Sequence, residues 1–184
     1  MGYQLAMNQA IGLGVLDDQM AAIRDLNRNL EFRKAVKHAI DGKAFAKAMS
    51  KGPFVTVYAG GLARDSAFFD ADATSFFPYN PAGANSILDG LGLMDTDGNG
   101  VRNLPNGGGD LVINLVQNKG SENEMLLGDG MATMMSEVGI KINIKPMEDT
   151  EPTRQAGEWD WLLVRSQQEM AFPNSGYWSD MGPV

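Results

Sequence analysis

The residues best suited to chemistry in this sequence form an acidic loop in the middle of the chain. Asp95, Asp97 and Asn99 occupy alternate positions, and Gly100 follows them. Oxygen ligands at this spacing are typical of the first half of a calcium loop, in which a glycine permits the turn. The glutamate expected at the twelfth position is missing, because Asn106 stands there. Two interpretations stay open: a calcium site, or an Asx-rich turn whose side chains bond to their own backbone.

Residues that usually supply nucleophiles or thiolate ligands are scarce. The chain contains no cysteine, and His38 is its one histidine. Disulfides and cysteine nucleophiles are therefore excluded, and a Ser-His-Asp triad has almost nothing to be built from. His38 lies beside Lys34 and Lys37 on a predicted helix, which favours an exposed surface histidine over a catalyst. We therefore expect a protein that is not an enzyme.

Charge and hydropathy exclude two further classes of partner. The formal net charge is −8 over 184 residues, with no long basic run. Nucleic acid and an anionic membrane surface are therefore disfavoured as partners. No apolar run approaches the ~20 residues of a membrane helix, so we expect no insertion into a membrane. With 43% hydrophobic and 21% charged residues, the composition predicts one globular domain over residues 1–184.

The elements that must position these residues alternate between strands and helices. Asp17 or Asp18 is the expected N-cap of an early helix, and Asn80-Pro81 begins a later one. A strand–helix–strand unit follows, whose two strands should be parallel. Gly128 and Gly130 weaken its helix and predict a break. The sequence predicts an α/β domain with strands at 3–8, 111–115, 140–144 and 159–164, the last of them central because it is apolar on both faces.

Four stretches carry a pattern that is shared with a known family. They are EFRKAVKHAID at 31–41, YNPA leading to ILD at 79–89, LMDTDGNGVR at 93–102 and EVGIKI at 137–142. In this order and spacing they resemble the periplasmic oligopeptide- and dipeptide-type solute-binding proteins, family 5. The resemblance implies a mixed sheet flanked by helices, as one lobe of a periplasmic binding protein type II-like architecture. It also implies that residues 1–184 are the C-terminal-side lobe of a larger two-lobed protein.

The same resemblance implies a site just beyond the last predicted strand. Counting without a gap from Asp160 to Pro173 places Glu169 on the carboxylate that, in the family's peptide-binding branch, pairs with the ligand's α-amino group. Arg165 closes the strand and is a candidate partner for a ligand carboxylate or for Glu169. Trp161 is a candidate aromatic for the cleft. The alternatives are a solvated loop carboxylate, a surface arginine and a core tryptophan.

The function that the resemblance implies is solute capture for an ABC importer. Peptides or related small solutes would bind between two lobes and pass to a membrane permease, in a periplasmic (extracytoplasmic) location. No cofactor is expected apart from the candidate calcium at Asp95, Asp97 and Asn99. The alternative is a calcium-stabilised interaction module with no role in transport, which rests on the acidic loop alone.

Overall fold

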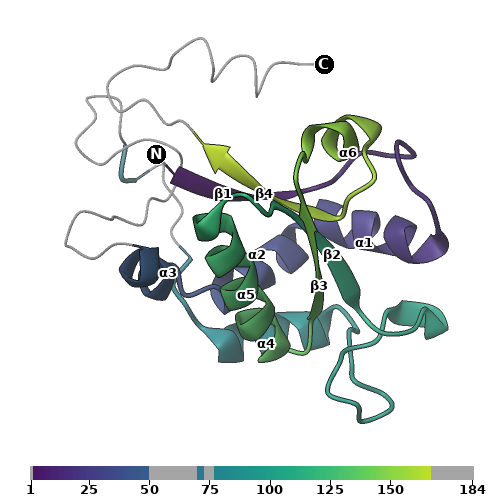
Figure 1. Ribbon diagram of the computed structural model, residues 1–184. Helices are drawn as coiled ribbons and strands as arrows, with labels where there is room; N and C mark the ends of the chain where they lie inside the picture. Colours follow the sequence, from purple (N-terminus) through teal and green to yellow (C-terminus); the bar gives the residue numbers. More distant parts are fainter. Residues whose placement is uncertain (1, 50–69, 73–76, 167–184) are drawn as a thin grey trace.

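The fold is a four-stranded sheet with helices packed around it (Figure 1). The computed structural model describes residues 2–49, 70–72 and 77–166. None of the described helices is both long and apolar enough to cross a membrane. In chain order the elements are β1 (Gly2–Met7), α1 (Asp18–Arg28), α2 (Leu30–Ala39), α3 (Gly42–Met49), α4 (Pro81–Gly90), the 3₁₀ turn η1 (Pro105–Gly107), β2 (Val112–Asn118), α5 (Glu122–Ser136), β3 (Lys141–Met147), α6 (Glu151–Ala156) and β4 (Trp161–Ser166).

The sheet is mixed, in the order β1-β4-β2-β3. Strand β2 is parallel to both of its neighbours, β3 and β4, whereas β1 runs antiparallel to β4. The predicted strands, the parallel pair and the interior place of the last strand are confirmed. The strand that was expected at 159–164 begins two residues later, at Trp161.

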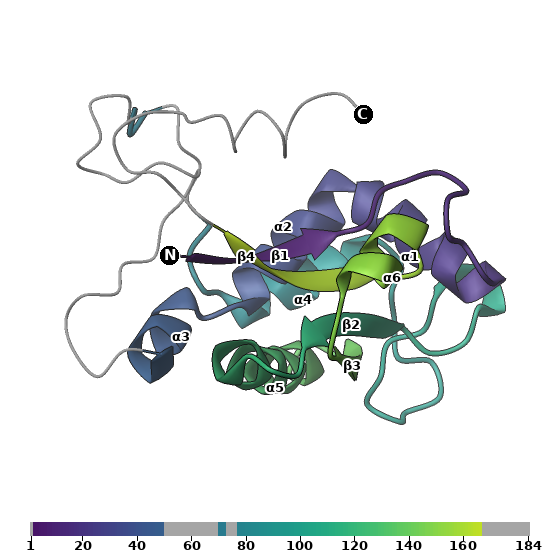
Figure 2. The ribbon, with the colours of Figure 1, turned by 45° about the horizontal axis from the view of Figure 1, so that its top comes forward.

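The two crossovers leave the sheet toward different faces. Helix α5 joins β2 to β3, and α6 joins β3 back across β2 to β4. Right-handed connections that run in opposite directions lie on opposite faces of a sheet. In both views α5 and α6 lie on different sides of β2 and β3 (Figures 1 and 2). Val116 and Leu162 point away from the α5 face and are still only 2% exposed, as expected for a sheet that is covered on both sides.

Helices α1 and α4 begin at the N-cap residues that the sequence predicted. Asp17 accepts a hydrogen bond from Met20 N at 2.7 Å, and Asn80 accepts one from Gly83 N at 3.0 Å. Each bond satisfies one of the amides that a helix leaves unpaired at its N-terminus. The short helix α6 and the turn η1 were not predicted, because neither carries an apolar period.

Helix α5 is unbroken, so the predicted break at its glycines is wrong. Each glycine allows another side chain to approach the helix closely. A Cβ at Gly128 would lie 1.8 Å from Gln117 Oε1, and one at Gly130 would lie 2.4 Å from a ring carbon of Phe45. Packing against β2 and α3 therefore outweighs the low helix propensity of glycine.

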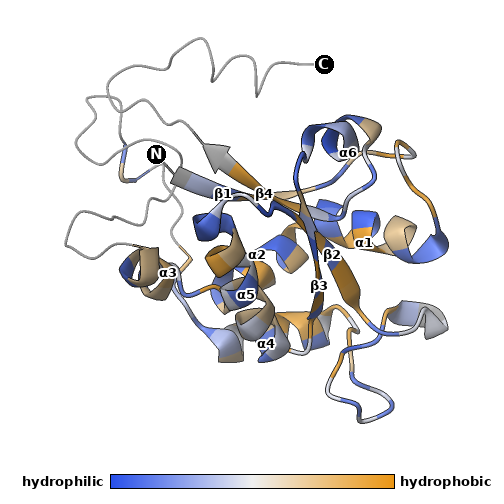
Figure 3. Ribbon diagram, viewed as in Figure 1, coloured by the Kyte–Doolittle hydropathy of each residue, from blue (hydrophilic) through white to orange (hydrophobic). Residues whose placement is uncertain are grey.

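One hydrophobic core fills the space between the sheet and helices α1, α2, α4 and α5. Hydrophobic residues gather on β2 and the neighbouring helices, whereas α6 and the acidic loop are largely hydrophilic (Figure 3). At about 25 cal/mol per Å² of buried apolar surface, this cluster supplies the main drive for folding. Its buried members are Ile23, Phe32, Ala35, Val36, Ala39, Ala84, Leu88, Leu93, Leu104, Leu111, Ile113, Leu115, Leu127, Met131, Met135, Val138, Ile140, Trp161 and Leu163.

Replacing Gly128 with alanine should destabilise the protein although alanine favours helices. Propensity alone would stabilise the helix by about 1 kcal/mol. The new Cβ would displace the amide of Gln117, which is fully buried, and overpacking of this kind costs about 1–3 kcal/mol. Urea unfolding measures the net effect. Gly90→Ala at the end of α4, where a Cβ meets nothing within 4 Å, is the control. A Gly128→Ala variant more stable than wild type would contradict the packing argument.

Candidate functional site

The carboxyl edge of the sheet is the part of the fold most suited to bind a ligand. Strands β2, β3 and β4 run in the same direction, so their carboxyl ends lie along one edge. The chain leaves the adjacent strands β2 and β3 toward opposite faces, through α5 and α6. In open α/β sheets ligands bind outside the carboxyl ends of the strands, at such a change of direction.

The loop after β2 is held by a dense set of hydrogen bonds. The Asn118 side chain accepts from Gly120 N at 2.7 Å, and Ser121 N donates to Asn118 O at 3.2 Å. Lys119 N donates to Met147 O at the end of β3, at 2.8 Å. These bonds fix the loop relative to both strands, so side chains on it project from a rigid frame.

Glu124 completes this frame from inside the first turn of α5. The residue is 6% exposed, and its carboxylate accepts a hydrogen bond from Asn118 N at 2.8 Å. Ser121 caps the helix by accepting from Glu124 N at 3.3 Å. The sequence suggests a capping box here, in which Glu124 would bond to Ser121 N. The glutamate instead reaches three residues further back and holds the end of β2.

Two pairs of polar side chains lie at this edge, and sequence reasoning missed both. Lys119 Nζ lies 2.6 Å from Glu148 Oε1, and the two side chains are 50% and 79% exposed. Asn123 Nδ2 donates to the Tyr3 hydroxyl at 3.3 Å. No local motif marks these residues, since their pairing depends on the register of β2 against β3 and on the place of β1 beside α5.

Two of the predicted site residues, Arg165 and Glu169, come at and after the end of β4 in the sequence. Arg165 lies in the strand opposite Tyr3, which brings its backbone to the same edge. The side chain of Arg165 and the whole of Glu169 lie outside the described residues. Their predicted roles in solute binding stay predictions.

Trp161 has the place of a core residue. Its side chain is 0% exposed and belongs to the hydrophobic core. The indole Nε1 donates to Asn27 Oδ1 at 2.9 Å, which satisfies the polar atom of the ring. No surface of the indole is left for a solute, so the role of Trp161 as a ligand-binding residue is corrected to core packing. The strand's alternation turns Trp161 toward the helices.

A buried polar network surrounds this tryptophan at the opposite edge of the sheet. Arg24 is 1% exposed, and its guanidinium donates to the carbonyl oxygens of Ala10, Leu13, Gly157 and Trp159. It thereby joins the loop after β1 to the turn before β4. Such hydrogen bonds are needed to offset the cost of burying the charge.

Asp160 is the buried carboxylate of the same network. Its Oδ2 accepts from the backbone N and side-chain Nδ2 of Asn114, each at 2.9 Å. No described residue bonds to Oδ1. Burial raises the pKa of Asp160, and the bonds from Asn114 and the charge of Arg24 oppose that rise. This end of the sheet therefore carries a structural network rather than an accessible acid.

The acidic loop bonds to itself. Asp95 accepts from Gly98 N at 2.8 Å and from Gly100 N at 2.9 Å, which lowers the pKa of its carboxyl group. Asp97 accepts from Asn99 N, and Asn99 Nδ2 donates to Asp110. Among the described residues no three histidines, cysteines or acids are grouped as a metal site requires. The contacts are those of an Asx-rich turn, so the calcium interpretation of Asp95, Asp97 and Asn99 has no support from the geometry.

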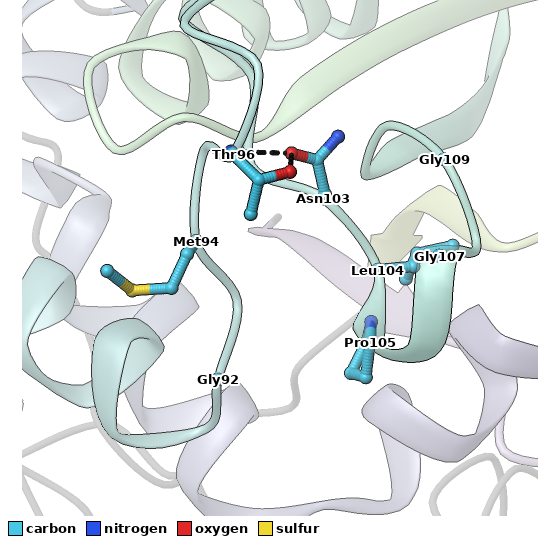
Figure 4. Close-up of a pocket in the computed structure, with 8 residues that line it drawn as sticks. All are labelled: Gly92, Met94, Thr96, Asn103, Leu104, Pro105, Gly107 and Gly109. Carbon is cyan, nitrogen blue, oxygen red and sulfur yellow. Dashed lines mark hydrogen bonds between the residues drawn. The ribbon is translucent and has the colours of Figure 1, made fainter.

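A shallow hollow lies next to this loop. It has a volume of about 330 Å³, and Figure 4 shows Met94 and Pro105 on opposite sides of it, with the Met94 side chain turned away from Pro105. Thr96 and Asn103 close one end through a hydrogen bond of 2.7 Å between their side chains. Glycines form much of its wall, and the described lining contains no charged side chain. The hollow therefore offers little to orient a ligand.

Replacing Asp95 with alanine should lower the thermal unfolding temperature whether or not calcium is present. The substitution removes the acceptor for two backbone amides, and this loss needs no ion. Differential scanning fluorimetry in EDTA and in calcium measures it. Asp97→Ala removes a single backbone contact and should have a smaller effect. A loss that occurs only in calcium would restore the metal site.

Replacing Asp160 with asparagine should change how stability depends on pH. Because the pKa is raised in the folded protein, folding favours the protonated form. The contribution of Asp160 to stability is therefore greatest below the ordinary pKa and falls as the pH rises through the raised value. Urea unfolding between about pH 4 and 7 should show wild type losing stability relative to Asp160→Asn. Parallel curves would contradict a raised pKa.

Comparison with known proteins gives the family. The sequence model of the "Bacterial extracellular solute-binding proteins, family 5 Middle" matches residues 1–183. The periplasmic alpha-galactoside-binding protein of Rhizobium meliloti (strain 1021) is 37% identical over 177 residues, which are 93% of this chain and 26% of that protein. The chain thus spans about a quarter of the length of this relative.

Solved structures agree with this assignment. The periplasmic binding protein MelB of Agrobacterium fabrum C58, in complex with stachyose, has a TM-score of 0.83 and 37% identity, over 90% of this chain and 26% of that one. The oligopeptide-binding protein OppA has a TM-score of 0.71 at 20% identity, over 88% of this chain and 24% of that one, and shows the fold alone. The two proteins at 37% identity are named as periplasmic binding proteins, which confirms the expected class and location. The chain belongs to family 5 of the bacterial extracellular solute-binding proteins.

Proposed function

We propose that this chain is one lobe of a periplasmic receptor that captures α-galactoside-type oligosaccharides for an ABC importer. The observation that carries the proposal is the 37% identity, over about nine-tenths of the chain, to two proteins whose names state an alpha-galactoside and a stachyose complex. The likeness to an oligopeptide-binding protein is at 20% identity and concerns the fold.

The sheet supports the proposal of a lobe within a longer chain. Strand β1 begins and β4 ends as paired neighbours, with Gly2 opposite Ser166. A unit whose two ends lie side by side can be inserted into a larger protein without disturbing its core. The relatives, about four times as long, have room for a second lobe. The expected domain assignment, residues 1–184 as one lobe, is part of this proposal.

The proposed mechanism starts from one wall of the binding site, which is rigid before the solute arrives. The carboxyl edge supplies one wall, and a second lobe would close over it and exclude water. Binding energy becomes fully available when the lobes close, so the closed state is the one that a membrane permease would recognise. The permease as partner is thus part of the same proposal.

Peptide capture is the second candidate, and it depends on Glu169. A carboxylate at that position would pair with the α-amino group of a peptide in a charge-assisted hydrogen bond. The saccharide proposal does not need this pairing. The two candidates therefore predict different effects on ligand affinity when the charge of Glu169 is removed.

Calorimetric titration of the receptor that contains this lobe distinguishes the candidates. We expect stachyose and raffinose to bind, tri-alanine to give no signal, and Glu169→Gln to leave stachyose affinity within about twofold, which is less than 0.5 kcal/mol. Tri-alanine binding that Glu169→Gln abolishes would replace the saccharide with a peptide. Stachyose binding abolished by Glu169→Gln would keep the saccharide but place Glu169 in its site.

A further inference from the structure

The first residues beyond the two parallel strands β2 and β3 form an ion pair at the carboxyl edge. We propose that Lys119 and Glu148, with Asn123 and Tyr3 at the same edge of the sheet, form a subsite that hydrogen-bonds saccharide hydroxyl groups and discriminates against solutes with a free ammonium group. This inference rests on the proposed function, because it takes a neutral oligosaccharide as the solute.

Strand register brings the ion pair together. Asn118 and Met147 are paired as the last residues of β2 and β3, so Lys119 and Glu148 follow at the same level. Their charged atoms meet at 2.6 Å. The chain then turns toward α5 after Lys119 and toward α6 after Glu148. The pair therefore lies where open α/β sheets bind their ligands.

The loop carrying Lys119 is fixed on both sides, which prepares the site in advance. Lys119 N is bonded to Met147 O, and the buried Glu124 carboxylate holds Asn118 N. A polar group on a rigid loop loses little entropy when a ligand binds. The backbone thus places the Lys119 side chain without help from a solute.

The chemistry of the pair suits hydroxyl groups. The ammonium of Lys119 has three donors, and the carboxylate of Glu148 accepts at both oxygens, so the single contact between them leaves several bonding positions free. A sugar hydroxyl both donates and accepts, so neighbouring hydroxyls can bond to each group in turn. An exposed ion pair contributes ~0–1 kcal/mol, so a solute can rearrange it at little cost.

Each acid described on these two loops has a positive charge, a hydrogen-bond donor or a helix N-terminus beside it. Glu148 is neutralised by Lys119. Asp149 accepts from Glu151 N at the start of α6. Glu122 lies in the first turn of α5, where the helix dipole offsets its charge. The amino group of a peptide would meet the positive charge of Lys119 beside Glu148, and this repulsion weakens pairing with that carboxylate.

Tyr3 and Asn123 extend the subsite toward β1. The Asn123 amide donates to the tyrosine oxygen, so the phenolic hydrogen can donate to a solute while the Asn123 carbonyl oxygen can accept. Both groups are uncharged. They add directional hydrogen bonds without attracting a charged solute.

Titration calorimetry with stachyose, on the receptor that contains this lobe, tests the subsite. Lys119→Met, Glu148→Gln and Asn123→Ala should each weaken stachyose binding about tenfold, the loss expected for one hydrogen bond to a charged or well-positioned group. The matched control is the exposed ion pair of α2, Lys34–Glu31, at 2.7 Å. Lys34→Met and Glu31→Gln should leave the affinity within twofold.

A second titration, with tri-alanine, measures how well the subsite discriminates against a peptide. Lys119→Met frees the Glu148 carboxylate, so this variant should gain affinity for tri-alanine, whereas Lys34→Met should not. Thermal unfolding of each variant checks that the lobe remains folded. Stachyose affinities within twofold of wild type for all three site variants would overturn the subsite and leave the saccharide receptor standing. A wild-type receptor that binds tri-alanine and not stachyose would remove the proposed function itself.

Discussion

Strand β2 has a parallel neighbour on each side, and the rest of the structure follows from this constraint. Parallel strands cannot be joined by a tight turn, so each pairing requires a crossover that returns the chain to the other edge. Two crossovers running in opposite directions cover both faces of β2. The strand can therefore be apolar along most of its length, with Ile113 and Leu115 toward the helices and Val116 on the other face.

The same constraint separates the two edges of the sheet by role. At the amino edge of the parallel strands, Arg24, Asn27 and Asp160 are buried and bonded largely to backbone groups. Buried polar groups with fixed partners hold their surroundings rigidly but offer nothing to a solute. At the carboxyl edge, Lys119 pairs with Glu148 and Asn123 donates to Tyr3, and both contacts are exposed. Rigidity at one edge thus supports the exposed polar groups at the other.

The fold is preserved at a lower sequence identity than the individual side chains are. A likeness at 20% identity to an oligopeptide-binding protein preserves the sheet and its crossovers, which depend on apolar periodicity. A likeness at 37% to proteins named for saccharides extends to more of the individual side chains. Side chains at strand ends are free to vary because they contribute little to the core. A binding fold can therefore take new solutes without being rebuilt.

The sequence by itself determined the elements and the class of the protein. Apolar alternation marked the strands, Asp17 and Asn80 marked helix starts, and four motifs indicated the family. Tertiary structure decided the rest, because the deciding contacts join residues far apart in the chain. Asn27 satisfies the indole of Trp161 and makes it a core residue, Gln117 and Phe45 explain the glycines of α5, and the register of β2 against β3 brings Lys119 to Glu148. Local patterns report which face of an element is buried, but not which distant partner meets it there.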